Sequence, residues 1–267
     1  MIDPAPYRSI AVASTFSPRF EQVLAEAKRI RDRFGSQLSL IYVGEKSDEI
    51  SAKFRETLPR LGLPADSEIH YEKGDPVEAI LRATEQNGIE LIVAGALEKT
   101  VVLHPFLGNV ARRLLREGCS SLMLFTHPER EPKSLRNIVF VADYSEHGAQ
   151  SLRRTLHLAA KEKSQRVFVV SLITTFDEAR ATREPATGKH DEEERLEHFV
   201  LDLGHTDVPM EVRCIRGNTG FAAADFVKSI EADLLVIPLD PGTNKGRLPA
   251  NLEWLADVIP CNLWVIR

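Results

Sequence analysis

Short apolar runs alternate with longer amphipathic stretches along the whole chain. Between the runs, apolar residues recur at helical spacing, as Phe20, Val23, Leu24, Ala27 and Ile30 do. The continuous apolar runs are typical of strands in a sheet that is covered on both faces. These predicted strands are 10–13, 38–43, 91–94, 122–125, 138–142, 167–172, 234–237 and 263–266. Strand and helix in alternation predict parallel strands with right-handed helical crossovers.

The order of elements occurs twice. The apolar runs 91–95 and 234–238 each follow an acidic residue, Glu90 or Asp233, and weaker strands near 68–71 and 212–215 complete each half. We therefore predict an α/β protein with two doubly wound, five-stranded parallel sheets in tandem repeat. The expected domains are 1–127 and 137–267, and the segment 128–136, with its prolines and alternating charges, is the predicted linker.

Composition narrows the class of protein. The 267 residues carry a formal net charge of -5, which argues against a nucleic-acid partner. Three widely spaced cysteines indicate a reducing compartment without a disulfide framework or zinc spacing, and Cys119 and Cys261, beside the last strands, are expected to be small buried residues. No signal peptide and no apolar run of about 18 residues is evident. A cytoplasmic protein without a membrane partner is expected.

Ligands of doubly wound sheets bind at the carboxyl ends of the strands, where the strand order reverses. In the first half these ends correspond to residues 14–17 and 95–98. Further on, Gly108 and Asn109 open a predicted helix, whose free N–H groups and positive dipole end suit a phosphate. The alternative is that the two residues only cap the helix.

These residues resemble the universal stress protein family. Its members carry an acidic residue at the end of the first strand and a glycine motif after the fourth. Gly95 and Gly108 match the first and third glycines of that motif, Asn109 stands where serine or threonine is usual, and Glu98 replaces the middle glycine. In the second half Asp143 matches the start of the pattern, whereas Pro238, Pro241 and Asn251 occupy the glycine positions.

The resemblance implies a universal-stress-type sandwich, similar to the adenine-nucleotide alpha-hydrolases, and ATP or another adenine nucleotide bound in domain 1. By position, Thr15 and Val43 would flank the nucleoside, and Gly95, Gly108 and Asn109 would hold the phosphates. The site in the second half would be degenerate, because Pro238 lacks an N–H group.

We identify no catalytic constellation and no metal site in the sequence. The expected function is a non-enzymatic, stress-related binding and regulatory module. The alternatives are an ATP or AMP sensor that uses domain 1 and a weak nucleotide phosphohydrolase. The resemblance also implies self-association, as an internal pseudo-dimer of the two domains or as a homodimer, and the apolar segment 100–107 is expected to pack against a neighbour or against its own sheet.

Overall fold

The chain forms two compact units in the computed structural model, Pro6–Lys133 and a second unit that contains Ser134–Arg267. The division falls inside the predicted linker. The structure describes residues 7–14, 16–96, 107–173, 189–204, 206–217, 219–240 and 259–267, with the backbone alone at 14, 189–191 and 219–221. Within these described ranges, no helix is long and apolar enough to cross a membrane.

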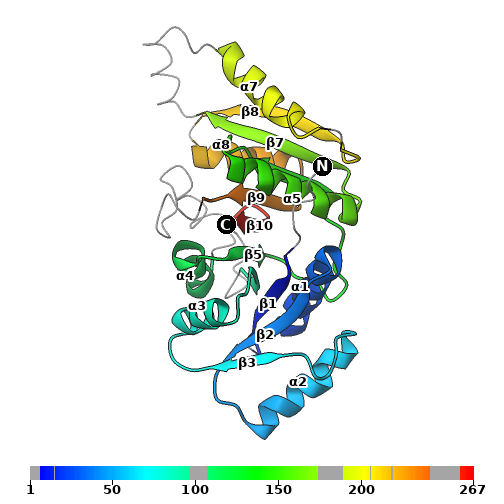
Figure 1. Ribbon diagram of the computed structural model, residues 1–267, viewed down its shortest axis with the longest axis vertical. Helices are drawn as coiled ribbons and strands as arrows, with labels where there is room; N and C mark the ends of the chain where they lie inside the picture. Colours follow the sequence, from blue (N-terminus) through cyan, green and yellow to red (C-terminus); the bar gives the residue numbers. More distant parts are fainter. Residues whose placement is uncertain are drawn as a thin grey trace. The chain divides into compact units, whose positions relative to one another are not determined.

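The first unit is a five-stranded parallel sheet with strand order β3-β2-β1-β4-β5. The order reverses between β1 and β4. Helices α1 and α2 cover one face of the sheet, and α3 and α4 cover the other (Figure 1). The elements are β1 (Ser9–Ser14), α1 (Phe20–Phe34), β2 (Gln37–Val43), α2 (Asp48–Arg60), β3 (Ile69–Glu72), α3 (Pro76–Gln86), β4 (Leu91–Gly95), α4 (Asn109–Glu117) and β5 (Ser121–Phe125).

The second unit repeats this topology with strand order β10-β9-β6-β7-β8, again parallel throughout the described pairs. The two doubly wound α/β sheets predicted from the sequence are thus confirmed. The elements are β6 (Asn137–Val141), α5 (Glu146–Glu162), β7 (Arg166–Ile173), α7 (Lys189–Leu201), β8 (Met210–Arg216), α8 (Thr219–Ser229), β9 (Leu234–Pro238) and β10 (Asn262–Ile266). Residues 174–188 lie outside the described residues, and α7 begins at Lys189.

Local signals in the sequence explain where the helices begin and end. Gly35 ends α1 in the left-handed conformation, with φ 69°, as its position in the pattern predicts. Asp75 caps α3 by accepting hydrogen bonds from the N–H groups of Val77 and Glu78, both at 3.1 Å. Pro76 then occupies the first helical turn, where a missing N–H group costs nothing.

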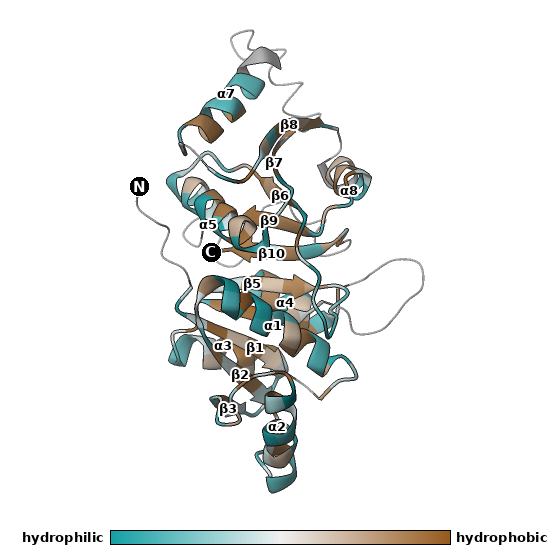
Figure 2. Cartoon of the chain, turned by 90° about the vertical axis from the view of Figure 1, so that its right-hand side faces the viewer, coloured by the Kyte–Doolittle hydropathy of each residue, from teal (hydrophilic) through white to brown (hydrophobic). Residues whose placement is uncertain are grey.

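The apolar strands are buried between helices in each unit, as the brown strands and teal outer helix surfaces of Figure 2 show. Phe54, Phe140 and Trp264 are among the largest fully buried side chains. One expectation about burial is wrong. Cys119 is exposed and Cys261 is partly exposed, although both residues lie directly beside the final strand of their unit, as expected.

Candidate functional site

A cavity of about 460 Å³ opens in the first unit at the point where the strand order reverses. Its floor is formed by the carboxyl ends of β1 and β4, which send their helices to opposite faces of the sheet. A crevice at this point is the expected consequence of doubly wound topology. The volume lies within the usual range for small-molecule sites, about 300–1,000 Å³.

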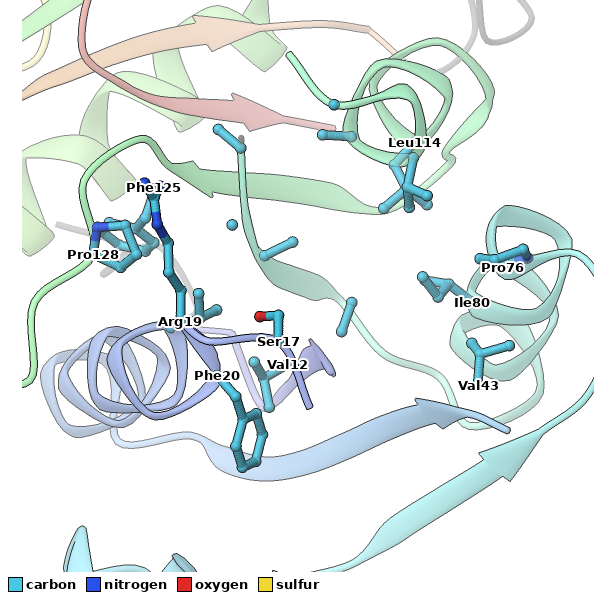
Figure 3. A pocket seen from close by; sticks show the side chains of 18 of the residues that line it. Val12, Ser17, Arg19, Phe20, Val43, Pro76, Ile80, Leu114, Phe125 and Pro128 are labelled. Carbon is cyan, nitrogen blue, oxygen red and sulfur yellow. The ribbon is translucent and has the colours of Figure 1, made fainter. Parts of the chain in front are cut away.

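The cavity wall is mostly apolar (Figure 3). Among the described residues that line it, Ser17 contributes a hydroxyl group and Arg19 a cationic side chain. Figure 3 shows Arg19 reaching from the start of α1 toward Phe125 and Pro128. The other lining residues that matter below are Val12, Val23, Val43, Ile80, Gly95, Gly108, Val110, Ala111 and Leu114.

The N-terminus of α4 faces this cavity through Gly108, Val110 and Ala111. Gly108 is the N-cap residue, and the described residues supply neither a side-chain cap nor an acidic group in the first turn. The first N–H groups of a helix lack intrahelical acceptors and carry the positive end of its dipole. The cavity therefore combines apolar walls with an anion-attracting end.

Two glycines keep space open around the cavity. A Cβ atom at Gly95 would lie 3.2 Å from Cγ2 of Val23, so a larger residue there would push against α1. Gly108 is buried and has φ -59°, which any residue can adopt, so its value to the site is its small volume. The N–H of Gly108 donates to the carbonyl oxygen of Ala96 at 2.9 Å, so this N–H group is not available to a ligand.

Three of the predicted site residues, Val43, Gly95 and Gly108, come together in the cavity. Asn109 lies at the first position of α4 but is exposed and is not part of the wall. Thr15 and Glu98 lie outside the described residues, as does the apolar segment up to residue 106.

The side chain of Asp143, the predicted site residue of the second unit, forms a hydrogen bond within its own turn. Its Oδ1 accepts a hydrogen bond from the N–H of Ser145 at 3.1 Å. The chain then passes so close to itself that a Cβ atom at Gly148 would lie 1.7 Å from the Asp143 carbonyl oxygen. This glycine thus permits the tight start of α5, which Ser145 caps through the N–H of Gly148.

A hydrogen-bonded cluster lies beside this turn in the second unit. The carboxylate of Glu192 on α7 accepts hydrogen bonds from Tyr144 at 2.6 Å and from Ser171 on β7. Arg195 stacks on the Tyr144 ring, 3.9 Å from its centroid. Burial raises the pKa of Tyr144 above its usual range, and the neighbouring Glu192 raises it further, so the phenol stays a neutral donor. The cluster holds α7 against the sheet.

Sequence reasoning missed Arg19, Phe125 and Pro128 as parts of the cavity wall. Phe125 belongs to a strand that was predicted, and Pro128 to a segment that was predicted as a linker. Their approach to the β1 end depends on the order of strands in space. The position of Arg19, shortly after the end of the first strand, was the one local signal that could have pointed to it.

Comparison with known proteins assigns the family. A family model described as the universal stress protein family matches residues 50–124 and 134–267. The chain therefore belongs to the universal stress protein family, with a family domain in each half. A comparison with curated protein sequences gave no match.

Solved structures share the fold over the whole chain. A functionally unknown protein from Pseudomonas aeruginosa PAO1 is similar with a TM-score of 0.73 and 16% identity, over 98% of this chain and 93% of that one. A universal stress protein from Archaeoglobus fulgidus DSM 4304 is similar with a TM-score of 0.66 and 15% identity, over 100% of this chain and 99% of that one.

Proposed function

We propose that this protein is a binding and regulatory module that holds an adenine nucleotide in its first unit. The observation that carries the proposal is the cavity between the ends of β1 and β4, whose wall includes the N-terminus of α4, a helix end that no described side chain caps. Such a helix end binds phosphate through backbone N–H groups and its dipole. The adenine part of the proposal rests on membership of the family.

The cavity fits both parts of a nucleotide. Val12, Val43 and Ile80 offer apolar surface for a planar base, and the first turn of α4, which contributes Val110 and Ala111 to the wall, is the proposed site for the phosphates. Arg19 adds a positive charge at the wall. A guanidinium group pairs well with phosphate because its donors form a planar fork.

The proposed role is binding without turnover. Among the described residues of the wall, Ser17 and Arg19 are the polar side chains, and neither is suited to act as a general base at neutral pH. A nucleotide held in this cavity is expected to stay intact. The second unit is proposed to have lost the site, because the carboxylate of Asp143 is engaged in its own turn and Pro238 lacks an N–H group.

Calorimetric titration with ATP, ADP and AMP tests the proposal. Gly108→Val should abolish binding, because the side chain would fill the space in front of α4, while its φ of -59° lets the backbone keep its conformation. Thermal unfolding of the variant without ligand separates lost binding from lost folding. An absence of heat for the wild-type protein with all three nucleotides would overturn the proposal.

Chromatographic analysis of the nucleotide after long incubation separates the alternative functions. Intact ATP supports a sensor or a storage module. Steady release of ADP and phosphate by the wild-type protein, lost in Gly108→Val, would instead establish the weak phosphohydrolase.

A further inference from the structure

The connector after β5 forms part of the cavity wall. Pro128 lines the cavity together with Phe125 and Arg19, and Figure 3 shows the three side chains gathered at one end of it. A ligand in the cavity would therefore touch the first turn of the segment that leads to the second unit. We call residues 127–133 the anchored segment.

A buried ion pair on α1 holds this segment. Glu26 is 4% exposed, and its Oε2 accepts a hydrogen bond from Nη2 of Arg29 at 2.7 Å. Nη1 of Arg29 donates to the carbonyl oxygen of Lys133 at 2.6 Å, and the N–H of Glu129 lies 3.5 Å from the other Glu26 oxygen. The pair thus contacts the backbone of the anchored segment at Glu129 and at Lys133.

Weaker contacts support the same arrangement. Arg130 forms an ion pair with Glu21 of α1 at 2.8 Å. The guanidinium group of Arg29 also lies over the ring of Phe125, 5.8 Å from its centroid. The exposed Arg130–Glu21 pair adds little stability. The hydrogen bonds that Glu26 and Arg29 make with the backbone involve charged groups, and such bonds are shorter and stronger than neutral ones.

Cavity and ion pair share one face of α1. Val23 lines the cavity, and Glu26 follows three residues later on the same side of the helix. The chain then enters the second unit directly. There the N–H of Leu135 donates to the buried carboxylate of Glu162 at 3.0 Å. A single residue, Ser134, separates the anchored segment from this second attachment.

We infer that the anchored segment is a movable wall of the nucleotide site, and that Glu26 and Arg29 are its positioning residues. The inference rests on the proposed nucleotide function. Occupancy of the cavity stabilises the docked segment, because the ligand packs against Pro128. By linkage, release of the segment lowers the affinity for the ligand by the same factor. Occupancy of the first unit is thereby communicated to the start of the second.

Hydrogen exchange of the peptide that covers the anchored segment, with and without saturating ATP, measures this coupling. ATP should slow exchange at the Glu129 amide by about fivefold, the lower end of ordinary coupling between sites. Titration of the same preparation gives the affinity. ATP binding without any change in exchange would overturn the inference alone, whereas absence of binding would overturn the proposed function and the inference with it.

Two variants and a matched control complete the test. Replacement of both charged partners, Glu26→Gln with Arg29→Gln, removes both charges of the pair together, and Pro128→Gly removes the wall while it keeps the ion pair. Each change should lower the affinity for ATP about fivefold. Each should also reduce, by a matching factor, the protection from hydrogen exchange that ATP gives the segment. Lys28→Ala removes an exposed cation and its pair with Asp32 on the same helix, and should leave both quantities unchanged. A change in unfolding temperature without a change in affinity in both variants would show a merely structural role and refute the inference.

Discussion

An acidic residue at the start of α4 should stabilise the helix and lower the affinity for a phosphate-bearing ligand. Asn109 is the first residue of α4, is exposed, and lies next to an N-cap glycine that offers no side-chain cap. In Asn109→Asp the carboxylate meets the positive end of the helix dipole, which is worth about 0.3–1 kcal/mol of stability. The same carboxylate repels a phosphate group bound at this helix end.

The size of the repulsion follows from simple electrostatics. Two unit charges about 4 Å apart in a water-like medium interact by about 1 kcal/mol. A penalty of about 1 kcal/mol corresponds to roughly fivefold weaker binding. The loss should grow with the charge of the ligand, so ATP should lose more affinity than AMP, and adenosine should lose almost none.

Calorimetric titration with ATP, AMP and adenosine, together with thermal unfolding of the ligand-free protein, tests both effects. Asn109→Ser, which places the residue usual in the family at this position, is the neutral control and should change neither the order of the ligands nor the unfolding temperature appreciably. An equal loss of affinity for adenosine and ATP in Asn109→Asp would refute the placement of phosphate at α4. So would a fall in unfolding temperature, because it would mean that the helix end is not as the structure shows it.

Three further predictions concern other parts of the chain. Glu98→Gly should raise the affinity for ATP by up to about tenfold in a titration, if removal of a carboxylate near phosphate recovers roughly 1.4 kcal/mol; no gain would place Glu98 away from the phosphates. The N–H of Glu78 and the guanidinium group of Arg113 hold the pKa of Asp75 below its usual range, so its charge stabilises the fold above about pH 4 and ceases to do so as the pH falls through the folded-state pKa. The unfolding temperature of Asp75→Asn should therefore lie below that of the wild-type protein at pH 6, with the difference shrinking at pH 3; a constant difference would refute the charge as its cause. The two units, expressed separately as 1–133 and 134–267, are expected to associate as an internal pseudo-dimer in sedimentation experiments, and two stable monomers without mutual affinity would contradict this.

The fold could be predicted because its determinants are local and repeated. Buried parallel strands produce uninterrupted apolar runs, and amphipathic helices produce the 3.6-residue period between them. Helix ends are also local signals. Gly35 ends α1 in the left-handed conformation that glycine favours, and Asp75 caps the start of α3 through its carboxylate. Cys119 shows the limit, since its place just before the last strand was predicted correctly, whereas its exposure depends on how that turn packs in three dimensions.

The cavity could be predicted only in part. Val43 and the two motif glycines are found by reference to strand ends, which the pattern locates well. Arg19 and Pro128 reach the cavity through the packing of α1 and the return of the chain after β5, and no periodicity encodes such distant approaches. The hydrogen bond from the Gly108 N–H to Ala96 is likewise a tertiary contact, and it makes this N–H group unavailable to a ligand.

The two units differ beyond their glycine positions, and strand register makes the comparison direct. Tyr42 of β2 pairs with Tyr71 of β3 in the first unit, and the corresponding pair in the second is Ser171 with Cys214. In the first unit the rings of Tyr42 and Phe54 pack at 5.7 Å to hold α2.

In the second unit, hydroxyl groups and the Glu192 carboxylate take over the task of attaching the helix. The attachment thus changes from ring packing, which depends on contact area, to directed hydrogen bonds, which depend on distance and angle. The turn that carries Tyr144 follows Asp143 directly and is held by this cluster. Restoring glycines around Pro238 would therefore leave the turn after β6 tied to α7, which supports the proposal that the first unit, rather than the second, binds the ligand.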